Sequence, residues 1–337
     1  MQIKVGIIGG AGYTAGELIR LLIHHPEVEI QFIHSSSQAG RRIADVHEGL
    51  IGDTDTVFSG ELPPNFTNEM RSMASSGDWG IDALFLCSAH GDSRKFMENN
   101  PIPETLKIVD LSMDYRHREN AGDFIYGLPE LNRAAIQQAK RIANPGCFAT
   151  AIQLALLPLA DKGLLNDEIH VHAVTGSTGA GAHPSETSHF SWRENNLSMY
   201  KAFNHQHLKE IKESIAQLQA GYKAAINFIP VRGNFTRGIF ATVYTACDLS
   251  IKEAVDLYAH FYADAAFTFV TDTELDLKQV VNTNKCLLHL EKHGTKLLIV
   301  SIIDNLLKGA SGQALQNFNL MFGLDEKTGL NLKPTAF

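Results

Sequence analysis

Hydrophobic and polar positions follow two different periods in the first third of the chain. Residues 2–8 form a short apolar run, whereas residues 14–25 repeat apolar side chains every three or four positions, as one face of a helix does. Residues 28–32 alternate, and residues 83–87 and 108–111 are short apolar runs typical of buried parallel strands. Strands that alternate with a helix in this way predict a doubly wound α/β domain.

After residue 146 the pattern of hydrophobic and polar positions changes to one that predicts antiparallel strands. Residues 169–174 alternate apolar and polar side chains, and residues 238–247 predict a long strand. Residues 286–291 are expected to pair with residues 296–303 across a turn at residues 292–295. This part of the chain therefore predicts a second, α+β domain built on a mostly antiparallel sheet.

Helix signals complete the predicted organisation. Ser250 and Glu253 form a capping box, in which hydroxyl and carboxylate satisfy each other's backbone donors, so a helix is expected to about residue 262. Apolar positions between residues 314 and 322 predict a last helix that returns to the first domain. The expected domains are residues 1–146, completed by about residues 310–337, and residues 147–309.

Length and composition agree with two folded domains and narrow the class of partner. The 337 residues exceed what one hydrophobic core organises, about 250 to 300 residues. With 44% hydrophobic and 20% charged residues the chain can bury enough apolar surface to fold. A net charge of -8 without clusters of Lys or Arg disfavours nucleic acid and anionic membranes, so a small molecule is the expected partner.

Targeting and membrane signals are missing from the sequence pattern. The apolar run at residues 2–8 is too short for a signal peptide, and no stretch reaches the roughly 18 residues that cross a bilayer. The four cysteines lie far apart without a C-x-x-C pair, which disfavours a disulfide framework. We therefore expect a cytoplasmic protein.

A glycine-rich segment with the pattern G-x-G-x-x-A lies between the first predicted strand and the first predicted helix. Glycines allow the tight turn and let backbone N–H groups approach a pyrophosphate at the helix N-terminus. The alternative is a tight turn without a ligand, but the position at the start of a Rossmann-type domain favours dinucleotide binding. The expected binding residues are Gly9, Gly10, Ala11, Gly12, Tyr13, Thr14 and Ala15.

The end of the second strand, near residue 33, lacks the Asp or Glu with which NAD-binding proteins hold the ribose hydroxyls. Hydroxyls and two arginines follow instead, and they suit a 2′-phosphate because guanidinium binds phosphate with two parallel hydrogen bonds. A solvated polar loop is the alternative. NADP is therefore favoured over NAD, with contacts from Ser35, Ser37, Arg41 and its neighbour Arg42.

Cys147 follows Asn144-Pro145-Gly146 and precedes an apolar helical run, so it is expected at a helix N-terminus. The helix dipole and the free N–H groups there stabilise a thiolate and an oxyanion on an attached acyl group, which favours a nucleophile over an inert core cysteine. The other cysteines lie in or beside strand-like runs and are expected in the core.

A nucleophilic thiol needs a base, and His205-Gln206-His207 is the densest histidine segment of the chain. A surface loop or half of a metal site would show the same pattern. No Cys, Asp or Glu stands at a recognisable ligand spacing, so we expect no zinc site, and the two histidines remain candidates for the basic partner.

Six segments together resemble the family of N-acetyl-gamma-glutamyl-phosphate reductases of arginine biosynthesis, within the aspartate-semialdehyde dehydrogenase superfamily. The resemblance covers nearly the whole chain and implies NADPH-dependent reduction of an acyl phosphate to an aldehyde through a cysteine thioester. It also implies a homodimer or homotetramer. The segments are residues 9–16, 109–116, 126–131, 144–150, 233–238 and 304–310.

The resemblance assigns roles to individual residues. It makes Cys147 the nucleophile and His207 the preferred base, with His205 beside it. It places the glycine-rich loop at residues 175–181, with Ser177 and Gly179, and Asn305 close to the nicotinamide. Arg116 and Arg237 are the expected anchors for the phosphate or carboxylate of the substrate.

Two departures from the family pattern leave the acyl group open. Ala182-His183-Pro184 replaces a basic residue after the glycine-rich loop, and Gln206 replaces an arginine between the two histidines. An N-succinyl substrate is therefore an alternative to the N-acetyl one. Aspartate-semialdehyde dehydrogenase is the nearest other enzyme, and a redox sensor that binds NADP without catalysis is the alternative from another class.

Overall fold

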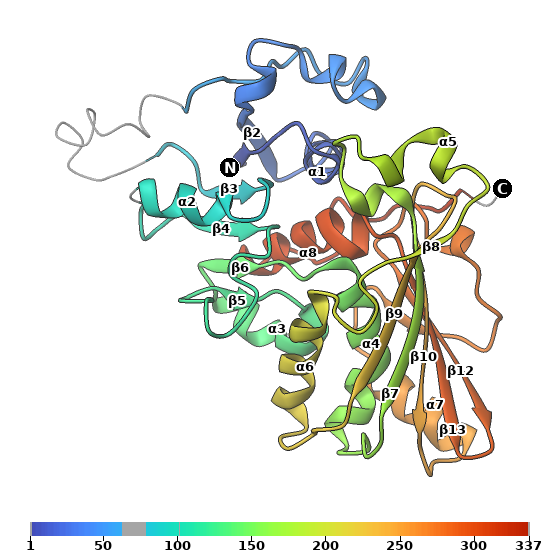
Figure 1. Cartoon of the computed structure of the whole chain (residues 1–337). Coiled ribbons are helices and arrows are strands. Elements are labelled where there is room, and N and C mark those ends of the chain that lie inside the picture. Colours follow the sequence, from blue (N-terminus) through green and yellow to red (C-terminus); the bar gives the residue numbers. More distant parts are fainter. Residues whose placement is uncertain (1, 63–78, 101, 336–337) are drawn as a thin grey trace. The chain divides into compact units, whose positions relative to one another are not determined.

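The computed structural model describes residues 2–62, 79–100 and 102–335 and divides into two compact units (Figure 1). Unit 1 consists of Met1–Gly127, Asn132–Asn144 and Ala314–Leu330. Unit 2 consists of Leu128–Leu131, Pro145–Gln313 and Asn331–Phe337. Of the residues expected to complete the first domain, 336 and 337 lie outside the described part of the chain.

Unit 1 is built on a six-stranded sheet with the order β2-β1-β3-β4-β6-β5, and every neighbouring pair is parallel. The order turns back at β1, as in a doubly wound fold, which confirms the predicted Rossmann-type class. The strands are β1 (Ile3–Ile8), β2 (Val28–His34), β3 (Ala83–Leu86), β4 (Lys107–Asp110), β5 (Ile125–Tyr126) and β6 (Arg141–Ala143).

Helices accompany these strands. Among them α8 returns from the end of the chain, and its Phe318 ring packs 5.6 Å from the Phe85 ring of β3. Helix α3 contains a non-helical residue, Asn132, at the point where the chain passes between the units. The elements are α1 (Tyr13–Leu22), η1 (Ser36–Gln38), η2 (Ile43–Asp45), η3 (Glu48–Leu50), α2 (Asp92–Asn99), α3 (Pro129–Gln138) and α8 (Gly312–Met321).

Unit 2 contains a seven-stranded sheet with the order β11-β12-β13-β10-β7-β9-β8. The pairs β11–β12 and β7–β9 are parallel and the other pairs are antiparallel, so the predicted mostly antiparallel α+β class is confirmed. The strands are β7 (Ile169–Thr175), β8 (Ser198–Met199), β9 (Ile226–Arg232), β10 (Ile239–Ala246), β11 (Thr268–Val270), β12 (Cys286–His293) and β13 (Lys296–Ile303).

The β12–β13 hairpin is tighter than the sequence predicts. Pairing continues to His293 opposite Lys296, so the turn contains only Gly294 and Thr295 instead of four residues. Gly294 has a φ of +58°, which a two-residue hairpin turn requires and glycine adopts without strain. The glycine therefore lets the strands pair two residues further than expected.

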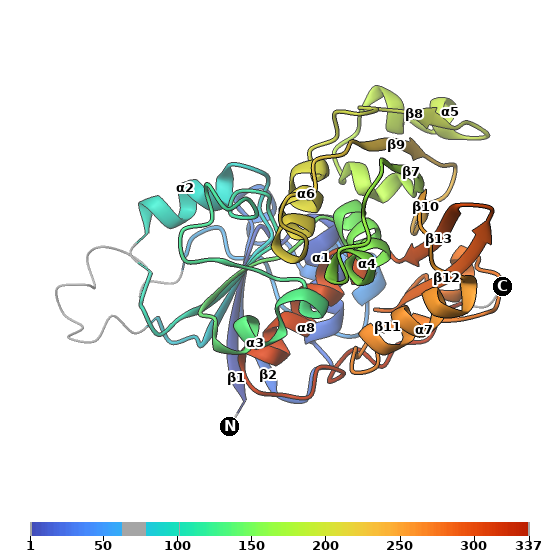
Figure 2. The same ribbon diagram turned by 90° about the horizontal axis from the view of Figure 1, so that it is seen from below.

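Helices of unit 2 cover one face of this sheet. Helix α4 packs on β10 and β13, and α7 lies along β12 in both views (Figures 1 and 2). The predicted capping box is confirmed, because Ser250 accepts from the Glu253 N–H and Glu253 accepts from the Ser250 N–H. The elements are α4 (Cys147–Asp161), η6 (Ser177–Ala180), η7 (Glu186–Ser188), α5 (Phe190–Arg193), α6 (His207–Leu218), α7 (Ile251–Phe261), η8 (Leu277–Gln279) and the π-helical turn η9 (Leu307–Ser311).

Helix α4 is the buried centre of unit 2 and contains a proline. Pro158 has no N–H for the carbonyl of Leu154, four residues earlier. The Tyr262 hydroxyl donates to that carbonyl instead, and the Tyr258 hydroxyl donates to the carbonyl of Ala155. These bonds keep α4 anchored to α7. No helix within residues 2–62, 79–100 and 102–335 is long and apolar enough to span a membrane.

Candidate active site

Cys147 is the first residue of α4 and is partly exposed. The N-cap residue is Gly146, which has no side chain to accept from the N–H groups of the first turn, and the first helical bond runs from Thr150 N to Gly146 O at 2.8 Å. The N–H groups that precede this bond have no acceptor inside the helix. The thiol therefore stands where the helix terminus stabilises negative charge.

Two of the other three cysteines lie in surroundings that oppose a thiolate. Burial raises the pKa of Cys286 to about 12. Cys87 keeps some exposed surface, but desolvation of its thiol raises the pKa above the usual value, and Asp110 adds to this shift. Cys247 is buried. Among the four cysteines, Cys147 alone opens a helix.

The two predicted histidines lie beside Cys147. A methyl group built on Gly146 would lie 2.4 Å from His207 Nε2, so the imidazole rests against the residue that precedes the thiol. His205 Nδ1 accepts from the His207 N–H at 3.2 Å, and Phe148 packs edge-on against both rings. The structure thus brings Cys147, His205 and His207 together, as the sequence analysis expects.

Burial has a strong effect on His205. Desolvation lowers the pKa of His205 to about 4, the positive charge of Lys201 adds to this effect, and Glu210 opposes it. At neutral pH His205 is therefore an uncharged imidazole whose Nδ1 accepts a hydrogen bond. His207 lies on the first turn of α6, closest to the glycine before the thiol.

Glu210 is a site residue that the sequence analysis missed. Its side chain is only 2% exposed; Oε2 accepts from the Gly146 N–H at 2.9 Å, and Oε1 lies 3.9 Å from His207 Nε2. One carboxylate thus contacts both the N-cap of the nucleophile's helix and the candidate base. The spacing from His207 to Glu210 places both side chains on one face of a helix, a signal that was available in the sequence.

A second contact to Cys147 comes from η9. A Cβ on Gly309 would lie 2.8 Å from Cys147 Cβ, so this backbone approaches the nucleophile closely. The neighbouring Lys308 is fully buried and pairs with Glu130 at 2.8 Å, and Thr268 donates to the same carboxylate. The sequence analysis named this segment but assigned no role to the lysine.

Both predicted anchoring arginines have partners within their own units. Arg116 donates from Nε to Asn144 O at 2.8 Å and from Nη2 to Leu111 O at 2.9 Å. Arg237 binds both carboxylate oxygens of the buried Asp304, at 3.0 and 3.2 Å. These bonds fix the two guanidinium groups in space, and their role toward a substrate stays a prediction.

Asn305 joins the glycine-rich loop to the start of β10. Its Oδ1 accepts from Gly238 N at 2.7 Å, and its Nδ2 donates to Thr178 Oγ1 at 3.0 Å. Ser177 N donates to Phe235 O at 2.8 Å, and Gly179 lies in the same 3₁₀ turn. The structure therefore gathers Ser177, Gly179 and Asn305 in one cluster of unit 2.

The dinucleotide segment of unit 1 has the expected geometry. Gly9 has a φ of +81°, and a Cβ there would lie 2.8 Å from the carbonyl carbon of Cys87. Gly12 is the N-cap of α1, and a Cβ on it would meet nothing within 4 Å, so space is open in front of the helix N-terminus. Its first turn carries no acidic residue. The open region adjoins Ala11, Tyr13, Thr14 and Ala15, and Gly10 N bonds to His34 O.

The segment after β2 fits a phosphate better than a pair of ribose hydroxyls. The strand ends at His34, and the Ser35 and Ser37 hydroxyls lie 3.4 Å apart. The exposed Arg41 donates to the side chain of Gln38 and to Asp45 O. No carboxylate follows the strand directly, but the Asp45 carboxylate pairs with Arg42 at 2.7 Å, and a 2′-phosphate contact from these residues stays a prediction.

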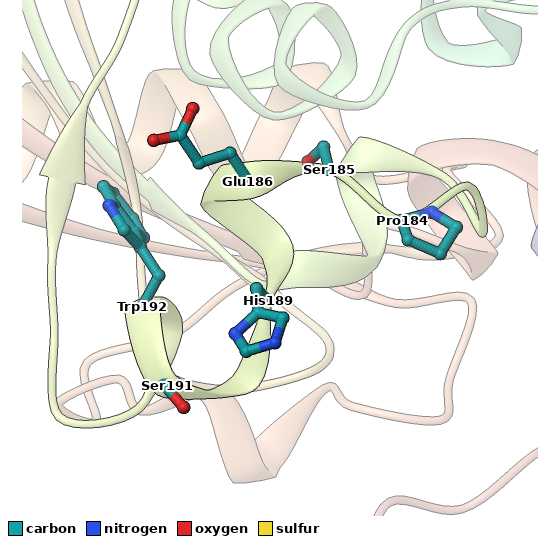
Figure 3. Close-up of a pocket in the computed structure, with 6 residues that line it drawn as sticks. All are labelled: Pro184, Ser185, Glu186, His189, Ser191 and Trp192. Carbon is teal, nitrogen blue, oxygen red and sulfur yellow. The ribbon is translucent and has the colours of Figure 1, made fainter.

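A pocket of about 630 Å³ lies in unit 2, on the segment that includes η7 and α5. Figure 3 shows that its lining side chains come from one continuous stretch of chain. None of the predicted catalytic residues lines it. The lining residues are Pro184, Ser185, Glu186, His189, Ser191 and Trp192.

Comparison with known proteins defines the class. Residues 4–139 match the family described as "Semialdehyde dehydrogenase, NAD binding domain", and residues 147–305 match "Semialdehyde dehydrogenase, dimerisation domain". Two solved structures share the fold. One is aspartate semialdehyde dehydrogenase II of Vibrio cholerae (TM-score 0.69, 16% identity), and the other is the aspartate semialdehyde dehydrogenase of Candida albicans with NADP (TM-score 0.67, 15% identity). Each alignment covers 96% of this chain and 99% of the other. Fold and matches thus define a semialdehyde dehydrogenase-type oxidoreductase.

More similar relatives specify the family. Curated N-acetyl-gamma-glutamyl-phosphate reductases are 64% identical in Azobacteroides pseudotrichonymphae, 62% in Phocaeicola vulgatus and 54% in Flavobacterium johnsoniae, each covering 100% of both chains. The chain belongs to the N-acetyl-gamma-glutamyl-phosphate reductase family. The family predicted from the six sequence segments is therefore confirmed.

Proposed function

We propose that the protein catalyses the NADPH-dependent reduction of N-acetyl-L-glutamyl 5-phosphate to N-acetyl-L-glutamate 5-semialdehyde and phosphate, a step of arginine biosynthesis. The observation that carries this proposal is Cys147 at the N-terminus of α4, preceded by a glycine that contacts both His207 and Glu210, in a chain of this family. A redox sensor has no need for a base beside a helix-capped thiol.

The residues of unit 1 fit NADP. The open N-terminus of α1 would hold the pyrophosphate with its N–H groups, and Ser35, Ser37 and Arg41 would hold the 2′-phosphate. When bound, NADPH supplies the hydride for the reduction. Ser177, Gly179 and Asn305 of unit 2 are proposed to bind its nicotinamide, since their backbone and side chains form one fixed cluster.

The chemistry proceeds through a thioester. The Cys147 thiolate attacks the acyl phosphate carbon, the C–O bond to phosphate breaks, and inorganic phosphate leaves. With NADPH bound, its hydride would reduce the thioester carbon; N–H groups of the first turn of α4 would hold the oxyanion, and cleavage of the C–S bond would release the aldehyde and return the thiolate. His207 accepts the thiol proton at Nε2, and Glu210 stabilises the imidazolium that results.

Arg116 and Arg237 are proposed to anchor the phosphate and a carboxylate of the substrate. Their bonds to Asn144 O and Asp304 preorganise the two guanidinium groups, which lowers the entropy lost on binding. We further propose residues 1–146 with the last helix as the NADP domain and residues 147–309 as the catalytic and oligomerising domain. The dimerisation-domain match supports a homodimer or homotetramer, and the biosynthetic family supports a cytoplasmic location.

The reverse reaction tests the proposal. Purified protein is mixed with NADP, phosphate and either N-acetyl- or N-succinyl-glutamate semialdehyde, and NADPH formation is followed by absorbance. Phosphate-dependent NADPH formation with one acyl form establishes the reaction and the acyl group. Activity with aspartate semialdehyde alone would move the assignment to aspartate-semialdehyde dehydrogenase, and inactivity with all three would favour a sensor.

A further inference from the structure

The end of β9 carries an arginine that the mechanism above does not use. Arg232 is the last residue of this strand and lies opposite Thr175 of the parallel β7 and Ser198 of β8. Gly233 N donates to Thr175 O at 2.8 Å, so the chain after β9 stays beside the start of the glycine-rich loop. Arg232 therefore stands at the carboxyl edge of a parallel strand pair, a position from which side chains commonly reach ligands.

The alternation of β9 places Arg232 on the same face as Phe228, four residues earlier. The Phe228 ring packs 5.2 Å from the Phe148 ring, which directly follows the nucleophile, and 5.4 Å from the His205 ring. This face of the strand is the one that meets α4 and the histidines. Arg232 thus extends the same face toward the site.

Tyr200 connects Arg232 to the catalytic residues. The guanidinium carbon of Arg232 lies 4.7 Å from the centre of the Tyr200 ring, and the Tyr200 ring lies 5.8 Å from the His205 ring. Burial raises the pKa of Tyr200 to about 12; negative charge at Cys147 adds to the rise, while Arg232 opposes it through its charge and a hydrogen bond. One aromatic side chain therefore touches the arginine and lies within electrostatic reach of the thiol.

The positive charge of Arg232 has no acidic partner in the described ranges 2–62, 79–100 and 102–335. Its Nε is enclosed and makes no hydrogen bond there. The other charged group that faces it is a second cation: Arg193 donates from Nη1 to Arg232 O at 2.9 Å, and its pKa is lowered by desolvation and by Arg232. The two positive charges repel each other, so an anion that binds beside Arg232 relieves this repulsion.

We propose that Arg232, held by Tyr200, binds a carboxylate of the substrate and so contributes to the choice of acyl amino acid. This inference rests on the proposed function, because it is the N-acylated glutamyl group that carries a carboxylate at a distance from the reacting carbon. Two carboxylates qualify: the α-carboxylate, present in both candidate substrates, and the second carboxylate of an N-succinyl group. Arg193 keeps the backbone of Arg232 in place through the carbonyl bond.

The test compares Arg232→Gln and Arg232→Lys with the wild type in the reverse assay, using both semialdehydes. Loss of a hydrogen bond to a charged group typically weakens binding by about tenfold or more. We therefore expect Arg232→Gln to raise KM for the semialdehyde at least about tenfold while kcat stays within about threefold. Arg232→Lys should recover part of the loss. KM for phosphate and for NADP should not change. Arg141→Gln, which removes an arginine paired with Asp123 in unit 1, is the matched control.

The outcomes distinguish the α-carboxylate from the carboxylate of the acyl group. They also distinguish a failure of this inference from a failure of the proposed function. An equal rise in KM for both semialdehydes assigns Arg232 to the α-carboxylate, and a rise for the N-succinyl form alone assigns it to the acyl carboxylate. An active Arg232→Gln enzyme with unchanged KM for the semialdehyde, or with a rise only for phosphate, overturns this inference and leaves the proposed function standing. A wild type that is inactive with both semialdehydes overturns the proposed function itself.

Protection of the thiol supplies a readout that does not need turnover. Free N-acylglutamate should slow the alkylation of Cys147 by iodoacetamide in the wild type. Arg232→Gln should need about tenfold more N-acylglutamate for the same protection while its unprotected alkylation rate stays the same. Equal protection of both proteins would contradict the inference even if the variant had lost its activity.

Discussion

Two cysteines of unit 2 each open a secondary-structure element, yet their surroundings differ in almost every physical respect. Cys147 begins α4, is partly exposed and is preceded by a glycine. Cys286 begins β12, is completely buried, and its sulfur lies 3.6 Å from the Ser301 hydroxyl. A helix N-terminus offers unpaired N–H groups that all point the same way, whereas a strand uses its N–H groups in the sheet. Both cysteines open an element, so the kind of element, helix or strand, and the burial of the thiol decide which of the two can become an anion.

Burial of charge differs between the two regions as well. Beside Cys286 lie Lys308 and Glu130, a buried pair whose opposite charges shift the pKa of Cys286 in opposite directions, while desolvation dominates and raises it. At Cys147 the contact from η9 is Gly309, the residue after that lysine, and it has no side chain. The pair therefore holds η9 in place, while the buried carboxylate next to the helix of Cys147 is that of Glu210, which accepts from the Gly146 N–H.

The largest expected effect is on turnover, when each thiol is replaced by a serine hydroxyl. Cys147→Ser should lower turnover by more than about a thousandfold, because a serine hydroxyl at neutral pH is a far weaker nucleophile than a thiolate. NADPH binding, measured by fluorescence titration, should stay nearly unchanged. Cys286→Ser is the matched control and should keep activity within a few fold. Comparable activity of Cys147→Ser and wild type would remove Cys147 from the mechanism.

The buried pair should decide stability. Lys308→Met leaves the Glu130 carboxylate without its cation in the core, and breaking one partner of a buried pair costs about 3–5 kcal/mol. We expect this loss in the free energy of urea unfolding. Lys252→Met, which removes an exposed i,i+4 pair with Asp256, should change it far less, because solvent screens that pair. The double variant Lys308→Met/Glu130→Gln should recover part of the loss; no recovery would show that the charges are not coupled.

Local sequence signals were sufficient for the fold class and for the position of the nucleophile. The turn after β1, the capping box at Ser250 and the glycine before Cys147 act over a few residues, so their geometry follows from neighbouring side chains. The helix at Cys147 is also marked by a long apolar run, which predicts a buried helix wherever the rest of the chain packs.

The remaining site residues depend on contacts between distant parts of the chain. Glu210 reaches Gly146 across 64 positions, and Arg232 comes beside Thr175 only because β9 pairs with β7 in parallel. Sheet order and register are set by the whole core, so no local pattern indicates these meetings. Gly309 belongs to the same group, since its closeness to Cys147 results from how the π-helical turn packs on α4.

Crowding the thiol should have an intermediate effect. In Gly309→Ala the new methyl group would lie 2.8 Å from Cys147 Cβ and 3.3 Å from Asp304 O, so either the first turn of α4 or η9 has to move. A displacement of about 1 Å at a reacting group lowers rate by about a hundredfold, and we expect a loss of kcat of that order. Gly49→Ala, where a Cβ meets nothing within 4 Å and φ is not positive, is the control. A Gly309→Ala enzyme with normal kcat would mean that the two backbones separate freely.

The pH dependence of stability is expected to show the smallest effect. His205 has a pKa of about 4 in the folded chain, against 6.5 ordinarily, because desolvation and Lys201 disfavour its charged form. The unfolded chain therefore binds a proton first, so this stabilisation is complete above pH 6.5 and is lost as pH falls toward 4. After allowance for solvent screening it amounts to about 2 kcal/mol.

Urea unfolding at several pH values in that window would measure this loss. The unfolding free energy should fall less steeply with decreasing pH in His205→Gln than in the wild type. This difference separates the effect of His205 from that of His25, since burial lowers the pKa of His25 as well. Lys201→Gln should reduce the loss as well, because removing the like charge lets the pKa of His205 rise. Parallel curves for the wild type and His205→Gln would show that His205 keeps its ordinary pKa. The buried His205 imidazole would then take up a proton as readily as an exposed one, and it would compete with His207 for the role of base.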